Sequence, residues 1–160
     1  MAAFEKIYEE YAKPVYRFLL SLTADEAMAE ELLQETFYRA LLHIDRFEGR
    51  CSLYTWLCQI GKNAWYKECQ RKKRQSGLTE ADLRKATVPS IEVQTIAKDQ
   101  AQQIRQAIRQ LPQPYRDVFI MHAFGGVKLK EIAAIYEKSE SWARVTFFRA
   151  KQQILREVSP

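Results

Sequence analysis

Patterns typical of β-strands are lacking in this sequence of 160 residues. Runs in which polar and apolar residues alternate, hairpin dipeptides and low-complexity repeats are absent. Glycine and proline are also scarce, with five of each. Apolar residues instead recur at steps of three and four along most of the chain, and 47% of all residues are hydrophobic. The sequence therefore predicts an all-α protein with compact cores.

Cysteine and histidine are too few for a disulfide framework or a zinc site. Cys51, Cys58 and Cys69 are odd in number and lack CxxC spacing, and His43 and His122 are the two histidines of the chain. We expect buried or half-buried thiols, no metal and no other cofactor. A redox-sensing thiol is the alternative.

Long hydrophobic runs are missing as well. No segment approaches the length of a membrane-spanning helix. The first residues, MAAFEKIYEEYAKP, contain acids where a secretory signal needs an uninterrupted apolar stretch. We expect a soluble cytoplasmic protein that does not insert into a membrane.

A catalytic constellation is also lacking. Glu30, Glu31, Gln34 and Glu35 share a polar helix face, but no nucleophile, metal triad or glycine-rich phosphate loop accompanies them. We therefore expect no enzymatic activity. The same acidic face remains a candidate docking surface for a basic partner.

Charge is distributed unevenly along the chain. Residues 1–48 contain 5 Lys and Arg against 10 Asp and Glu, whereas residues 49–74 contain 7 against 1. The net charge is +5 and the isoelectric point is near 9.1. The clustering of basic residues indicates a nucleic-acid partner, and the acidic segment indicates a different one.

The hydrophobic pattern predicts two small helical domains. Residues 1–74 form one bundle, in which Pro14 should kink the first helix or start a second segment. Thr23 and Glu26 predict a capping box, and Ser52 predicts the cap of a later helix. Residues 75–96 lose strong periodicity and form the predicted linker to a domain of residues 97–160.

The basic segment from Asp45 to Arg74 also carries aromatic residues. Cations beside aromatic faces suit unpaired bases. We expect Trp56 to be buried, and Tyr54 and Trp65 to be partly exposed beside a loop that can hold an extruded base. The alternative is a charged helix end that is merely solvated.

The C-terminal segment has the pattern of a helix-turn-helix. A short helix over Leu129–Tyr136 precedes a turn at Glu137 and Lys138, and a longer helix follows from about Ser141 to Val158. Its packing face holds Ala143, Phe147, Ala150 and Ile154. Its outward face holds Arg144, Val145, Phe148 and Arg149, which suit the major groove of DNA.

Two blocks of the sequence resemble the extracytoplasmic-function (ECF) group of bacterial RNA polymerase sigma factors, within the sigma-70 superfamily. AEELLQETFYRALLHIDRF and the overlapping FEGRCSLYTWLCQIGKNAWYKE resemble the second conserved region. LPQPYRDVFIMHAFGGVKLKEIAAIYEKSESWARVTFFRAK resembles the fourth. The resemblance covers nearly the whole chain and implies a factor that directs promoter-specific transcription initiation.

The resemblance also implies site residues. Glu31, Gln34 and Glu35 match positions that dock on the β′ clamp helices of core RNA polymerase. The implied minus-ten contacts are Phe47, Gly49, Arg50, Ser52, Lys62, Asn63 and Lys67. In this set the loop from Phe47 to Ser52 captures a flipped base of the minus-ten element. Asn63 lies on the helix that reads this element, and Lys62 and Lys67 contact backbone phosphates. The implied minus-thirty-five contacts are Arg144, Val145, Phe148 and Arg149.

The implied partners are core RNA polymerase, through the β′ clamp helices and the β subunit, and promoter DNA, both as a duplex and as a melted strand. An anti-sigma factor commonly holds such proteins inactive. One departure from the family pattern is Glu137, which stands where the turn often has glycine, and another is Lys138, which replaces an aliphatic residue. We expect a reshaped turn there.

A stand-alone helix-turn-helix regulator is the competing hypothesis. It would need the C-terminal segment alone and would leave residues 1–74 unexplained. It would also be expected to dimerise on palindromic DNA.

Overall fold

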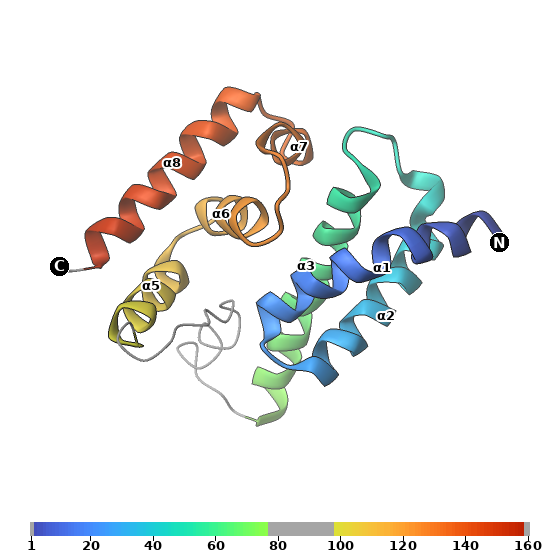
Figure 1. Cartoon of the computed structure of the whole chain (residues 1–160), viewed down its shortest axis with the longest axis horizontal. Coiled ribbons are helices and arrows are strands. Elements are labelled where there is room, and N and C mark those ends of the chain that lie inside the picture. The colour runs from blue at the N-terminus through green and yellow to red at the C-terminus, as the bar shows by residue number, and fades with distance from the viewer. Residues whose placement is uncertain (1, 77–97, 159–160) are drawn as a thin grey trace.

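The computed structural model describes residues 2–76 and 98–158, which form two groups of helices (Figure 1). Every regular element in these two ranges is helical, so the all-α prediction is confirmed for them. In the same ranges, no helix is both long and apolar enough to cross a membrane.

Residues 2–76, termed the N-terminal module, form three long helices and one short turn. These are α1 (Ala2–Thr23), α2 (Glu26–His43), the 3-10 turn η1 (Ile44–Arg46) and α3 (Leu53–Ser76). Each of the three long helices packs on the other two. Val15, Phe18 and Leu19 of α1 are buried, together with Leu32 and Phe37 of α2. The periodic apolar residues therefore build the core that the sequence predicts.

The ends of these helices follow from their capping residues. Asp25 caps α2, because its Oδ1 accepts a hydrogen bond from the backbone N–H of Met28 at 3.2 Å. The predicted capping box at Thr23 is therefore wrong by two residues. Ser52 acts as predicted, because its Oγ accepts a hydrogen bond from the N–H of Thr55 at 3.2 Å. Pro14 lies inside the continuous helix α1 and starts no second segment.

Residues 98–158, termed the C-terminal module, hold the remaining helices. These are α5 (Lys98–Gln110), α6 (Tyr115–Ala123), α7 (Leu129–Ile135) and α8 (Glu140–Glu157). The long helix α8 packs on the other three. Ser139 caps α8 by accepting from the N–H of Trp142 at 3.1 Å. The pair α7 and α8 confirms the predicted helix-turn-helix.

The predicted linker, residues 75–96, falls mostly outside the described residues. Residues 75 and 76 belong to α3, and the others are not described.

The two modules pack against each other, and their buried apolar residues form one continuous cluster. Gly125 lies at the contact between the modules. A Cβ at this position would lie 2.7 Å from the backbone oxygen of Met121 and 3.2 Å from the ring of Phe18 in α1. The Tyr54 hydroxyl donates to the Gly125 carbonyl at 2.5 Å. Glycine is needed here because a side chain would clash with the Met121 carbonyl and crowd the ring of Phe18.

Candidate polymerase and nucleic-acid interfaces

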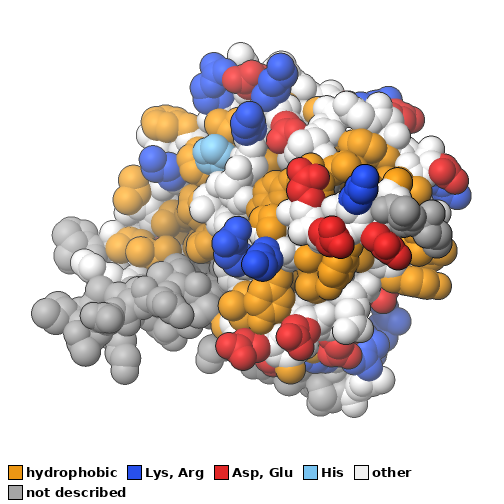
Figure 2. Space-filling model, turned by 45° about the vertical axis from the view of Figure 1, so that its right-hand side comes forward, with side chains coloured by type: hydrophobic (Ala, Val, Ile, Leu, Met, Phe, Trp, Pro, Cys, Tyr) orange, Lys and Arg blue, Asp and Glu red, His pale blue; other side chains and the backbone are white. Residues whose placement is uncertain are grey.

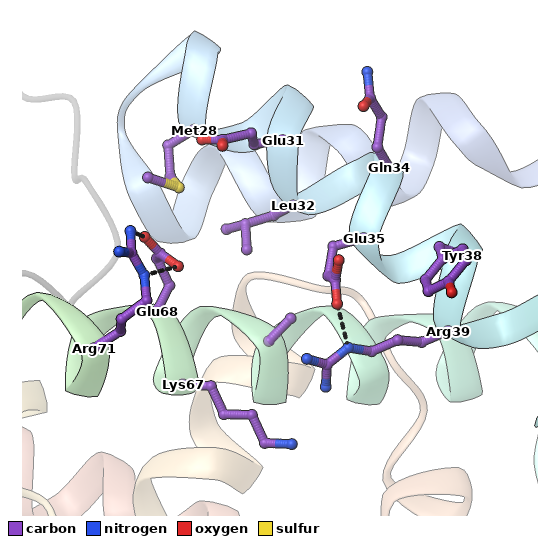
Figure 3. A pocket seen from close by; sticks show the side chains of 11 residues that line it. Met28, Glu31, Leu32, Gln34, Glu35, Tyr38, Arg39, Lys67, Glu68 and Arg71 are labelled. Atoms are coloured by element: carbon purple, nitrogen blue, oxygen red, sulfur yellow. Dashed lines mark hydrogen bonds and ion pairs between the residues drawn. The ribbon is translucent and has the colours of Figure 1, made fainter. Parts of the chain in front are cut away.

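The acidic face of α2 borders a hollow between α2 and α3. The hollow has a volume of about 590 Å³, and its lining includes Glu31, Gln34, Glu35 and, from α3, Lys67. Figure 3 shows Glu35 pointing toward α3 and Gln34 pointing away from it. The three residues of the predicted docking set therefore lie on one helix face at the rim of a concave surface.

Both signs of charge meet at this hollow. Glu35 Oε1 accepts from Arg39 Nε at 2.6 Å, which leaves Glu35 half-buried, whereas Glu31 and Gln34 are exposed. On α3, Arg71 pairs with Glu68, and this hydrogen bond lowers the pKa of Glu68. Figure 2, which brings the side of α1 and α2 forward, shows acidic side chains interspersed with hydrophobic ones. Such a mixed surface suits a protein partner better than nucleic acid.

The loop before α3 faces the C-terminal module. The Phe47 ring lies 5.1 Å from the ring of Trp56, which is half-buried where we expected it to be buried. Gly49 has a φ of +74°, a conformation that favours glycine. Arg50 contacts Glu48 at 2.9 Å and Glu137 of the C-terminal module at 2.8 Å.

Ser52 is also held by the C-terminal module. Its backbone N–H donates to Glu131 Oε1 at 2.5 Å, and the Thr55 hydroxyl donates to Glu131 Oε2 at 2.9 Å. Burial acts to raise the pKa of Glu131, but these hydrogen bonds outweigh it and leave the pKa below its usual value. Glu131 is therefore an ionised carboxylate at neutral pH, facing the start of α3.

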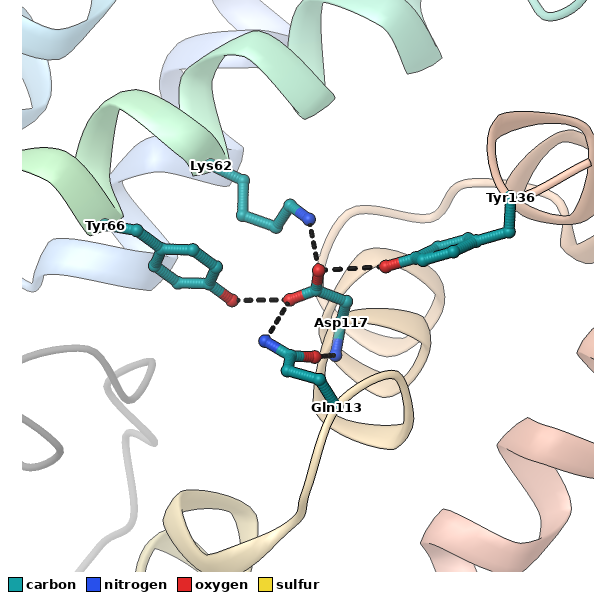
Figure 4. Close-up of polar contacts among 5 residues, drawn as sticks. All are labelled: Lys62, Tyr66, Gln113, Asp117 and Tyr136. Atoms are coloured by element: carbon teal, nitrogen blue, oxygen red, sulfur yellow. Dashed lines mark hydrogen bonds and ion pairs between the residues drawn. The ribbon is translucent and has the colours of Figure 1, made fainter.

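The structure differs from the prediction at Lys62. The side chain is 0% exposed, and its Nζ donates to Asp117 Oδ2 of α6 at 2.6 Å (Figure 4). In this arrangement Lys62 cannot contact a phosphate. Burial lowers the pKa of Lys62, and the attraction of Asp117 opposes that effect. A lysine in a basic segment looks solvent-exposed in the sequence, but here a carboxylate 55 residues away provides its partner.

Asp117 gathers donors from both modules. Besides Lys62, its carboxylate accepts from Tyr66 at 2.7 Å, Gln113 at 2.9 Å and Tyr136 at 2.9 Å. Burial acts to raise the pKa of Asp117, but Lys62 and the other donors hold it below its usual value. These five residues are termed the Asp117 cluster (Figure 4). Asp117 was not among the residues predicted from the sequence. The signal that could have indicated a buried carboxylate is its position next to the apolar residues Val118, Ile120 and Met121.

Other residues of α3 divide between surface and core. Asn63 and Lys67 are exposed, as DNA contacts require. Trp65 is only 4% exposed, so the prediction of a partly exposed stacking platform is wrong. Its neighbours Ala64 and Cys69 are buried with it. The helical face of Trp65 is the core face of α3. Tyr54 is half-buried, as expected, but its hydroxyl is engaged by Gly125.

The predicted recognition helix α8 presents its outward face to solvent. Arg144 and Arg149 are exposed, and so are Val145 (46%) and Phe148 (57%). Arg144 pairs with Glu140 one turn earlier at 2.8 Å. On the opposite face, Ala143, Ala150 and Ile154 are buried, and the Phe147 ring stacks on Phe119 at 5.5 Å. The two faces follow the predicted division.

The turn before α8 has an unusual backbone. Glu137 has a φ of +55°, the left-handed conformation that a glycine would adopt more easily. The N–H of Lys138 donates to the carbonyl of Ala133 at 2.9 Å and closes the end of α7. Glu137 thus keeps the glycine-like conformation, so the prediction of a reshaped turn is wrong. Its side chain reaches Arg50.

The three cysteines are buried or half-buried, as predicted. Cys58 and Cys69 are buried, and burial raises the pKa of each thiol to about 12. Cys51 is half-buried and its pKa is raised by burial and by Glu131. Within residues 2–76 and 98–158, no group of three His, Cys, Asp or Glu residues is placed to hold a metal ion.

Comparison with known protein families gives two matches. Residues 7–75 match sigma-70 region 2, and residues 101–154 match sigma-70 region 4. Together they span most of the chain, and their order is that of the two modules.

Curated relatives are similar over nearly their whole length. The ECF RNA polymerase sigma factor SigM of Bacillus subtilis is 29% identical over 150 residues, covering 94% of this chain and 91% of SigM. SigX of the same organism is 28% identical, covering 96% of this chain and 86% of SigX.

Among solved structures, the fold resembles the sigma factor RpoE in complex with the anti-sigma factor NepR from Bartonella quintana. The TM-score is 0.65 at 22% identity, with 98% of this chain and 97% of the other covered. CnrH in complex with the cytosolic domain of CnrY gives a TM-score of 0.59 at 18% identity, with 97% and 86% covered. From its two sigma-70 regions and these relatives, the chain belongs to the ECF group of RNA polymerase sigma factors.

Proposed function

We propose that this protein binds core RNA polymerase and directs it to a specific set of promoters in the bacterial cytoplasm, without catalysis of its own. The N-terminal module docks on the polymerase and holds the melted minus-ten strand. The C-terminal module binds the minus-thirty-five duplex. The separation of an acidic face on α2 from an exposed Arg-containing face on α8 carries the proposal.

For the polymerase, the proposed contacts are Glu31, Gln34 and Glu35 of α2, which would meet the β′ clamp helices. Their placement at the rim of the α2–α3 hollow supports this assignment, since a helical partner can lie in a concave surface of mixed charge. The β subunit is the second proposed partner within core polymerase.

For DNA, the two modules have different tasks. Asn63 and Lys67 are exposed on α3 and suit a single strand, and the loop from Phe47 to Ser52 would receive a flipped base. Arg144 and Arg149 suit guanine edges or phosphates, whereas Val145 and Phe148 suit thymine methyl groups. Two weak sites on one chain gain affinity through effective concentration.

Control by an anti-sigma factor is part of the proposal. The solved complex of RpoE with NepR shows such a partner on a protein of the same fold. A partner of this kind that is anchored in a membrane would link the protein to the cell envelope.

The test is run-off transcription with bacterial core polymerase on genomic fragments, with and without the purified protein. Specific start sites that appear only with the protein are expected, and their upstream sequences would give both promoter elements. A stand-alone regulator predicts a different result: no new starts, no co-elution with core polymerase, and a dimer that binds duplex DNA by itself.

A further inference from the structure

Three of the proposed minus-ten contacts are already occupied by carboxylates of the C-terminal module. Arg50 contacts Glu137 at 2.8 Å, and Lys62 contacts Asp117 at 2.6 Å. The third is Ser52, whose N–H donates to Glu131 at 2.5 Å. A guanidinium, an ammonium and a backbone N–H are the groups that bind phosphates. Each therefore has an anionic oxygen in place of a phosphate oxygen.

We propose that the C-terminal module occupies part of the minus-ten surface of the free protein by acting as a phosphate mimic, with Asp117, Glu131 and Glu137 in the places of DNA phosphates. The inference rests on the proposed function, which assigns the loop with Arg50 and Ser52 to DNA, and on the family resemblance, which implies the same role for Lys62. Binding of the melted strand then requires the two modules to separate.

The Asp117 cluster is the buried centre of this contact. Lys62 is 0% exposed and the Asp117 side chain is 13% exposed, so both charges have left water and depend on each other. Tyr66 adds a second donor from α3, and the Arg116 guanidinium lies 5.8 Å from its ring centroid. Removing the charge of Asp117 leaves a buried ammonium group without its counterion, which favours opening of the modules.

The two outer contacts lie at the exposed edge of the same surface. The strained backbone of Glu137 places its carboxylate on Arg50, and Glu131 caps the start of α3 through Ser52 and Thr55. The recognition residues Arg144 and Arg149 remain exposed. The closed arrangement therefore occupies Arg50, Ser52 and Lys62 of the minus-ten surface, while Asn63, Lys67 and the minus-thirty-five surface stay exposed.

The first test uses small-angle X-ray scattering of the free full-length protein. A compact chain of 160 residues has a radius of gyration of about 15 Å. The triple variant Asp117→Asn, Glu131→Gln, Glu137→Gln should give a larger radius, whereas wild type should not exceed the compact value. The control triple Glu5→Gln, Glu9→Gln, Glu10→Gln makes the same charge change on the exposed start of α1 and should stay compact.

The second test measures fluorescence anisotropy of a labelled, mixed-sequence single strand of about 20 nucleotides, whose backbone charge such surfaces follow. The contact triple should bind it at least tenfold more tightly than wild type, and the control triple should not. An equal gain in both triples would show an effect of net charge and overturn the proposal.

Asp117 also accepts from Tyr136 and Gln113 inside its own module, so its replacement risks unfolding that module. The double variant Glu131→Gln, Glu137→Gln keeps Asp117 and should open in part, with wild-type helicity by circular dichroism. If the radius of gyration is unchanged in both variants, the proposal that these three carboxylates hold the modules together is overturned. An increased radius without tighter DNA binding would instead overturn the masking of DNA and leave the run-off result untouched.

Discussion

At the residue scale, Glu137 is a non-glycine residue whose backbone adopts a left-handed conformation. Its φ of +55° costs a non-glycine residue about 1 to 2 kcal/mol. The family resemblance pointed to this position as unusual, since glycine often stands there. Only the structure shows the consequence, because Arg50 lies 87 residues away in the sequence.

Replacing Glu137 with glycine should stabilise the protein. The gain should be about 0.5 to 1 kcal/mol, because relief of the left-handed strain exceeds the roughly 0.4 to 1 kcal/mol by which glycine favours the unfolded chain. The measurement is the free energy of unfolding from urea denaturation.

Two further substitutions serve as controls for this change. Ala24 has the same φ of +55°, so Ala24→Gly should give a somewhat larger gain, since no ion pair is lost there. Lys138 is not among the residues with positive φ, so Lys138→Gly should destabilise the protein. A loss of stability in Glu137→Gly would mean that the contact with Arg50 outweighs the strain.

At the element scale, α8 is the helix that the sequence predicts best. Its apolar residues at steps of three and four fix which face is buried, and the opposite face carries the proposed contacts. Helix α3 was predicted less well. Trp65 lies on its core face and Lys62 on the face covered by α6, and neither position can be inferred without knowing which element packs there.

Reversing the charge of the α2 face should abolish polymerase binding. In Glu31→Lys, Glu35→Lys the new lysines lie beside Arg39, Lys67 and Arg71 and leave Glu68 as the one acidic residue among those that line the hollow. The affinity for core polymerase should fall at least tenfold, or about 1.4 kcal/mol. Co-elution on size-exclusion chromatography measures it. Glu9→Lys, Glu10→Lys on α1 is the matched control, and unchanged co-elution of the α2 variant would place docking elsewhere.

The opposite pattern is expected for α8. Arg149→Ala should weaken binding to a promoter found by run-off transcription by about 1 to 3 kcal/mol, because one base or phosphate contact is lost. Its affinity for core polymerase should stay at the wild-type value, as measured in the same co-elution assay. Equal loss of both activities would contradict the assignment of α8.

At the scale of the whole molecule, the order of the helices in residues 2–76 and 98–158 follows from the sequence, but the packing of one module on the other does not. Gly125 and Asp117 join the modules, and each sits in a segment whose pattern indicates only an ordinary turn or helix. Their partners, Phe18, Tyr54 and Lys62, are more than 50 residues away. Residue spacing within a helix carries no information on such contacts.

Cys51 offers a native probe of this packing. It is half-buried in hollows that are also lined by Glu131 and Ala134 of the C-terminal module, and burial raises its pKa. Asp117 makes no hydrogen bond or ion pair with Cys51. Faster reaction of Cys51 with Ellman's reagent in Asp117→Asn would therefore report separation of the modules. We expect severalfold faster labelling of Cys51 at pH 8, since exposure increases the thiolate fraction.

Cys58 and Cys69 supply the internal control for that experiment. Both are buried in the N-terminal module and should stay slow. Acceleration of all three thiols would indicate global unfolding, and an unchanged rate for Cys51 would contradict opening of the modules.

The burial of Lys62 has a thermodynamic consequence for any partner that binds only the separated modules. A protein that is open in about 1% of its molecules binds such a partner a hundredfold more weakly than its open form does. Once one partner has shifted the equilibrium to the open form, the next partner binds without the free-energy cost of separating the modules. A second ligand that also binds only the separated modules would then be positively cooperative with the promoter strand, each strengthening the other's binding by the same factor.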